Sequence, residues 1–140
     1  MGYAALRVIN EDRIAPGSGF SQHAHKDMDI LTLVLSGALT HEDTLGNVAT
    51  IAPGEVQLMS AGSGIRHSEM NASQSNAAHF LQIWLIPDRL GGAPTYQQAP
   101  LPARDRATDW TLLASGTDEN APLALLSDSH VSITYPREGI

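Results

Sequence analysis

Four side chains that can hold a metal ion lie in two short runs of this sequence. His23 and His25 are two residues apart in the first run, and His67 and Glu69 are two residues apart in the second. Because side chains on a β-strand point to alternate faces, each pair would project from one face of its strand. Three imidazoles and one carboxylate suit a divalent first-row metal, which would keep one or two positions open for a substrate or for oxygen.

A plainer interpretation is that each pair is only the polar face of an amphipathic strand. That interpretation is adequate for either pair alone, but the two pairs share further features. A glycine-rich turn precedes each of them, at residues 15–19 and 61–64, and three of the six histidines in the chain fall in these two runs. We therefore predict one metal site shared by the two strands.

The spacing within the two runs resembles the two motifs of the cupin superfamily, G-x5-H-x-H-x3-[E/D] and G-x2-H-x3-N. The matching positions are Gly17, His23, His25 and Asp29 in the first motif, and Gly64, His67 and Asn71 in the second. This resemblance implies a double-stranded β-helix, in which a small barrel holds its metal in the interior.

Longer stretches narrow the resemblance to the pirin family, over roughly residues 3 to 98. They are LRVINED at 6–12, HKDM at 25–28, MSAGSGIRHSE at 59–69 and FLQIW at 80–84. Pirins hold their metal with the H-x-H pair and with the histidine and glutamate of H-S-E. On this chain those ligands correspond to His23, His25, His67 and Glu69. Cupins in general use the acid of the first motif, so Asp29 is the alternative ligand.

The resemblance to pirins also implies a function. It suggests an Fe(II) enzyme similar to quercetin 2,3-dioxygenases, which cleave flavonols, with Glu69 as both a ligand and the base that takes the proton of the substrate's 3-hydroxyl. The alternative is a non-catalytic, iron-binding interaction module, because pirins also include transcriptional co-regulators. No sequence feature separates the two, whereas turnover of a flavonol by the iron-loaded protein would.

Composition limits the other classes of function. The 140 residues suffice for one domain, and because they include no cysteine, a disulfide framework and thiolate chemistry are excluded. No stretch is apolar for long enough to span a membrane and no signal peptide is visible, so we expect a soluble, cytoplasmic protein. Eight basic and fifteen acidic residues give a net charge of −7, which argues against direct binding to nucleic acid.

Short runs of β-forming residues, separated by turn signals at intervals of about ten residues, predict an all-β antiparallel barrel or jelly roll. A hairpin is expected around residues 44–47, between strands at 38–43 and 48–51. The other strands are expected at residues 4–9, 30–35, 56–60, 79–86, 110–114, 123–127 and 131–135.

Three parts follow from this pattern. Residues 1–89 would form the metal-binding cupin core, residues 90–109 a connection rich in proline and glycine, and residues 110–140 a set of short strands that are a remnant of, or a substitute for, a second cupin domain. Because so short a tail cannot form another barrel, a sheet face or edge would stay bare, and we expect a homodimer. The tail would pack against the partner or fold back onto its own barrel.

The remaining polar candidates have competing interpretations. His41, His79 and His130 are expected to be ordinary surface or hydrogen-bonded histidines. Gln82 either faces the cavity near the metal or is a buried amide that bonds to the backbone. Asp29, if it is no ligand, either bonds to a ligand imidazole or is exposed.

Overall fold

The protein is built from β-strands arranged in three sheets. The computed structural model describes residues 5–102 and 110–134, and all regular secondary structure within those residues is strand. This confirms the all-β class and the cupin-type barrel predicted from the spacing of strands and turns. Within the described ranges, no helix is long and apolar enough to cross a membrane.

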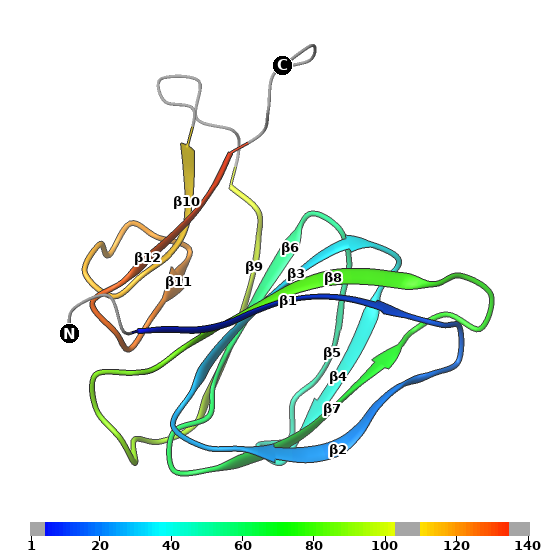
Figure 1. The fold of residues 1–140 in the computed structure, drawn as a ribbon, viewed down its shortest axis with the longest axis horizontal. Coiled ribbons are helices and arrows are strands. Elements are labelled where there is room, and N and C mark those ends of the chain that lie inside the picture. Colours follow the sequence, from blue (N-terminus) through cyan, green and yellow to red (C-terminus); the bar gives the residue numbers. More distant parts are fainter. Residues whose placement is uncertain (1–4, 103–109, 135–140) are drawn as a thin grey trace.

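Two antiparallel sheets face each other and form the barrel (Figure 1). The first has the order β1-β8-β3-β6-β9 and contains β1 (Leu6–Ile14), β3 (Asp29–Ser36), β6 (Glu55–Ser60), β8 (Ala78–Leu85) and β9 (Thr95–Pro100). The second has the order β2-β7-β4-β5 and contains β2 (Gly19–His25), β4 (Leu39–Asp43), β5 (Val48–Ile51) and β7 (Ile65–Asn71).

Apolar side chains close the barrel at both ends and leave its middle polar. One cluster joins the two sheets through Ile14, Val34, Leu39, Ile51, Ala78 and Phe80. A second cluster, near the start of β7, contains Ile30, Met59, Ala61 and Ile65. Between them the inward-facing positions of β7 and β8 carry His67, Glu69 and Gln82, all buried. The fold therefore places polar groups in a closed interior, where each needs a partner.

A third, smaller sheet covers the outer face of the first one. It has the order β11-β10-β12 and contains β10 (Trp110–Ser115), β11 (Leu123–Ala124) and β12 (His130–Thr134). The buried residues of this contact are Leu31, Val56, Leu58 and Leu85 from the barrel and Ala114, Leu123 and Leu125 from the tail. The described part of the tail thus folds back onto its own barrel, which was one of the two expected arrangements. Both faces of β3 are covered, which explains its nearly continuous apolar sequence.

The stretch expected to be a connection, residues 90–109, also contributes a strand. Within it, β9 pairs with β6 at the edge of the first sheet, with Met59 opposite Tyr96. The prolines in this stretch had indicated a connection without a strand. Pro94 precedes the strand and Pro100 ends it, and an edge strand tolerates proline because one side of its backbone has no ladder to complete. Residues 103–109 lie outside the described residues.

Candidate metal centre

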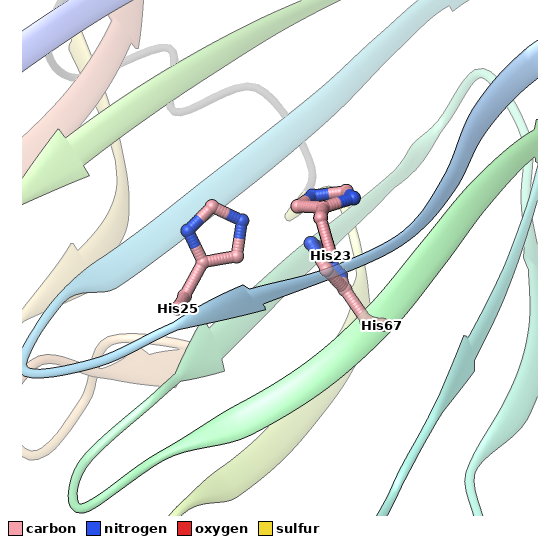
Figure 2. A group of neighbouring side chains, drawn as sticks. All are labelled: His23, His25 and His67. Atoms are coloured by element: carbon pink, nitrogen blue, oxygen red, sulfur yellow. The ribbon is translucent and has the colours of Figure 1, made fainter.

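The two ligand pairs meet because β2 and β7 are antiparallel neighbours. His23 is directly opposite His67 in the register of this pair. Directly opposed side chains on one face of a sheet lie close together, and His25 is on the same face of β2 as His23. Figure 2 shows His23 and His25 on β2 turned toward His67 on β7. The period of two seen in the sequence is therefore the period seen in the structure.

The three imidazoles form a compact cluster. Their ring centroids are 4.5 Å apart for His23 and His67, 4.8 Å for His23 and His25, and 4.9 Å for His25 and His67. A set of ring nitrogens, one from each residue, lies with all members within 4.8 Å of one another. One ion can therefore contact all three rings after small side-chain movements.

Glu69 lies at the edge of this cluster and crosses the barrel interior toward β8. Its Oε1 is 3.5 Å from Nε2 of His67, and its Oε2 accepts a hydrogen bond of 2.7 Å from Nε2 of Gln82. Gln82 also donates to the Thr32 hydroxyl at 3.2 Å, so its amide is held from two sides. Of the two interpretations of Gln82, the structure supports the one in which it faces the cavity.

A loop that glycine permits positions the start of β7. Gly62 has a φ of +53°, and a Cβ there would collide with the carbonyl oxygen of Gly92. The carbonyl of Gly62 accepts a 2.8 Å hydrogen bond from the amide of Asp27, and the amide of Ser63 donates to the carbonyl of Gly92 at 2.7 Å. These bonds tie the end of β2 to the turn before His67, and so fix the two ligand strands against each other.

Burial keeps His25 and His67 uncharged at neutral pH. Removal from water, with the nearby His23, lowers the pKa of His25 to about 4. Removal from water, reinforced by His23, His25 and His41, lowers the pKa of His67 to about 3. The pKa of Glu69 is raised, chiefly by its burial, although Gln82 opposes that shift. Neutral imidazoles offer the lone pairs that metal ions need.

Two ring nitrogens of the cluster have lone pairs that are free to bind a cation. The Nδ1 of His23 lies 2.8 Å from the carbonyl oxygen of Ser21, and since a carbonyl can only accept, Nδ1 carries the proton and Nε2 keeps a lone pair. The Nε2 of His67 is fully buried and has no hydrogen-bond partner. An unpartnered buried nitrogen is costly in a folded protein, and a metal ion bound to it would remove that cost.

The stability of the metal-free protein should therefore fall as the pH falls from 7 to 5. The pKa values of His25 and His67 are lower in the folded chain than the ordinary 6.5, so the unfolded chain binds protons first. The loss begins near pH 6.5 and continues toward pH 4. The raised pKa of Glu69 acts in the opposite direction, so the thermal midpoint is best compared with that of His67→Gln. If the thermal midpoints of the wild type and His67→Gln depended equally on pH, protonation of His67 would not contribute to the loss of stability.

Beside the cluster is a cavity of about 320 Å³, which His23, His25 and Glu69 line but His67 does not. The cavity is lined by Asn10, Asp12, Phe20, His23, His25, Glu69, Gln82 and Trp84. Its aromatic walls come from different sheets, Phe20 from β2 and Trp84 from β8, and the ring of Trp84 meets that of His25 edge-on at 5.2 Å. Asn10 and Asp12 of β1 were not singled out from the sequence, because nothing local shows that β1 crosses this opening.

Asp29 has neither of the two roles expected for it if it is no metal ligand, which were a bond to a ligand imidazole and an exposed position. It is buried, not exposed, and its Oδ2 accepts a 2.8 Å hydrogen bond from the backbone amide of Leu126. That bond ties β3 to the segment between β11 and β12. Because the third sheet covers the outer face of β3, a carboxylate at the start of this strand lies in the contact between barrel and tail.

The other histidines divide into two kinds. His79 bonds to Glu11 at 2.7 Å on the outside of the barrel, and His130 bonds to the hydroxyl of Ser115 at 2.7 Å, both as expected. His41 also has a partner, but it is completely buried in the barrel, with its ring centroid 5.3 Å from that of His67. This position could not be predicted from the sequence, because it depends on the register between β4 and β7.

Comparison with known proteins shows which family this chain matches. The family model described as Pirin matches residues 1–85. A protein of Caulobacter vibrioides named "Pirin-like protein" is 47% identical over 132 residues, which are 94% of this chain and 56% of the relative. A protein of Escherichia coli K12 named "Quercetin 2,3-dioxygenase" is 53% identical over 98 residues, which are 70% of this chain and 42% of the relative.

A solved structure has the same fold. A bacterial pirin from Escherichia coli, in complex with nickel(II), superimposes with a TM-score of 0.84 at 42% identity, over 94% of this chain and 56% of that one. The chain spans about half the length of these relatives.

Proposed function

Because the chain belongs to the pirin family, we propose that it is an iron-dependent dioxygenase that cleaves a flavonol such as quercetin. The observation that carries this proposal is the cluster of three imidazoles, with Glu69 beside it, next to a cavity walled by aromatic rings. The name of the Escherichia coli relative supports the reaction, and the nickel in the solved pirin supports a divalent ion at such a site.

The ligands of the proposed metal are His23, His25, His67 and Glu69. Three neutral nitrogens and one carboxylate oxygen suit iron as well as nickel, since both bind imidazole readily. Asp29 is not part of this set, because it bonds to the tail through Leu126 and neither lines the cavity nor belongs to the cluster of ring nitrogens. Fe(II) is our choice among the first-row ions because it supports chemistry with oxygen.

The cavity fits a flat aromatic substrate with hydroxyl groups. Phe20 and Trp84 offer ring faces and edges from the two facing sheets, and aromatic pairs of this kind favour planar ligands. Asn10 and Asp12 on β1 add an amide and a carboxylate to the lining, and both can bond to hydroxyl groups on such a ring. A few polar groups in an apolar pocket orient a ligand without dominating its affinity.

Glu69 would accept the proton of the substrate's 3-hydroxyl. A bound divalent metal would supply the positive charge that lowers the pKa of that hydroxyl and would prepare the substrate for oxygen. Gln82 occupies Oε2 of Glu69, which leaves Oε1 as the atom that is free to contact the metal or to take the proton. The buried surroundings exclude bulk water, so a proton placed on Glu69 would not be lost at once.

Oxygen consumption tests the proposal directly. The iron-loaded protein, supplied with quercetin in air, should consume oxygen in step with the loss of flavonol absorbance. His79→Ala is a matched control, because it removes a histidine that bonds to a carboxylate outside the barrel, and it should react at the same rate. A protein that holds iron but consumes no oxygen with any flavonol would instead be the non-catalytic metal-binding module.

We also propose that two chains form a two-fold dimer. The strands β10–β12 cover the sheet face that we expected to be bare, so we place the proposed contact between the two chains on another surface. Leu6 and Ile9 of β1 are 50% and 65% exposed, and they border a groove with Val131 of β12. Exposed apolar side chains beside an edge strand favour association, and a two-fold pair is its commonest closed form.

Light scattering at micromolar concentration decides this point. We expect a mass twice that of the 14.9 kDa chain, and a return toward the single-chain mass in Ile9→Lys. A wild type with the mass of one chain would contradict the dimer.

A further inference from the structure

A buried histidine and aspartate lie directly behind His67, on the strand next to it. β4 pairs with β7, with His41 opposite Glu69 and Asp43 opposite His67. The side chains of His41 and Asp43 are 1% and 0% exposed, and neither residue lines the cavity beside the cluster. The ring of His41 packs against that of Tyr96, with centroids 4.8 Å apart and ring planes tilted by 33°.

The protons in this group can be assigned from its partners. Nε2 of His41 is 2.6 Å from Oδ2 of Asp43. The other partners of that carboxylate are the amides of Leu45 and Asn47 and the side-chain amide of Asn47, all of which donate. Asp43 therefore accepts every bond, and Nε2 of His41 carries a proton.

Nδ1 of His41 then keeps a lone pair, since the side-chain nitrogen of Gln57 that faces it can only donate. The side-chain amide of Gln57 lies 3.4 Å from it, and Nδ1 of His67 lies 3.5 Å from it. Both distances exceed the usual upper limit of about 3.2 Å for a hydrogen bond, so these contacts are weak. With the proton of His67 on Nδ1, donor faces acceptor. In the other tautomer two lone pairs would face each other, so the first arrangement is favoured.

We infer that His41 is a positioning residue for the proposed metal centre: it holds the proton of His67 on Nδ1 and so turns the Nε2 lone pair of His67 toward His23 and His25. This inference rests on the proposed function and adds a residue to it. In this tautomer Nε2 of His67 carries a lone pair. That atom is buried and has no hydrogen-bond partner, so its lone pair stays available for a metal. Ligand imidazoles are commonly oriented through their second nitrogen in this way.

The effect of losing His41 should be large for a residue that is not itself a ligand. Removing such a partner of a ligand histidine weakens metal binding by about 10-fold to 100-fold. We expect a loss of that size in His41→Leu. In His41→Asn the side-chain oxygen can stand close to the former Nδ1 and accept from His67, so most of the affinity should return. A role confined to filling space would give the reverse order, because leucine fills the site better.

Two measurements test this, and one of them needs no metal. Long-range proton–nitrogen correlation spectra of the metal-free protein, labelled with nitrogen-15 in histidine, report the tautomer of each ring. His67 should carry its proton on Nδ1 in the wild type and in His79→Leu, and should lose this preference in His41→Leu. The wild type and the same variants are then titrated with nickel(II) against a chromogenic chelator.

The outcomes separate the two proposals. His67 with its proton on Nε2 in the wild type, or equal nickel affinity in the wild type and a folded His41→Leu, would overturn the role of His41. If His41→Leu fails to fold, the wild-type spectrum and His41→Asn still decide the matter. A wild type that binds no nickel would remove the metal centre, while the spectra would still test what His41 does to His67.

Discussion

Replacing His67 with alanine should abolish stoichiometric metal binding. The wild type, reconstituted with iron, should hold about one ion per chain, and His67→Ala should bind it more than about 100-fold more weakly, because loss of a ligand exceeds the effect of losing a ligand's partner. His67 has the central place in the cluster, since it lies opposite His23, within 4.9 Å of His25 and beside Glu69. Elemental analysis after removal of free iron measures the result.

Asp29→Asn is the control that separates the two possible ligand sets. The asparagine oxygen can still accept the bond from the amide of Leu126, so the contact between barrel and tail should survive. Its iron content should equal that of the wild type. Equal iron in wild type and His67→Ala, or loss of iron in Asp29→Asn alone, would show that the ligands are not those proposed.

Replacing Glu69 with glutamine should change stability and metal binding in opposite directions. The pKa of Glu69 is raised above its ordinary 4.5, mainly by burial, so the ionised form is unfavourable in the metal-free interior. A neutral amide of the same shape removes that penalty and can still accept from Gln82. We expect the thermal midpoint of the metal-free protein to rise by a few degrees at pH 7, the shift that about 1 kcal/mol produces in a chain of this size.

The same change should weaken iron binding by at least about 10-fold and remove most oxygen consumption with quercetin, because an amide is a poor ligand and no base. The sign of the stability effect can be checked with pH. A raised pKa in the folded state means that the protonated form is favoured, so the gain should vanish below about pH 4.5, where Glu69 is protonated in both states. Unchanged oxygen consumption in Glu69→Gln would show that this carboxylate is neither ligand nor base.

The sequence was sufficient for features that depend on one strand or one turn. The alternation of His23 with His25, and of His67 with Glu69, needs only the period of a strand, and both pairs face the interior as predicted. The hairpin around residues 44–47 was also predicted correctly, because its turn residues are local signals. It connects β4 to β5, with Leu39 opposite Ile51.

Features that depend on register or on distant contacts could not be predicted. His41 lies 26 residues before His67, and only the alignment of β4 with β7 brings the two rings together. The bond from Leu126 to Asp29 joins residues 97 positions apart, and no local pattern in the sequence reveals it. The same is true of Asn10 and Asp12, which reach the cavity because β1 pairs with β8.

The position of iron in a crystal of the iron-loaded protein decides whether His23, His25, His67 and Glu69 are its ligands. Crystals of the iron-loaded protein, measured on both sides of the iron absorption edge, show iron as anomalous difference density. We expect one peak per chain, about 2.1 Å from a ring nitrogen of each of His23, His25 and His67, and at a similar distance from a carboxylate oxygen of Glu69. Iron-loaded crystals without a peak among these four side chains, or with one bound by Asp29 instead, would contradict it.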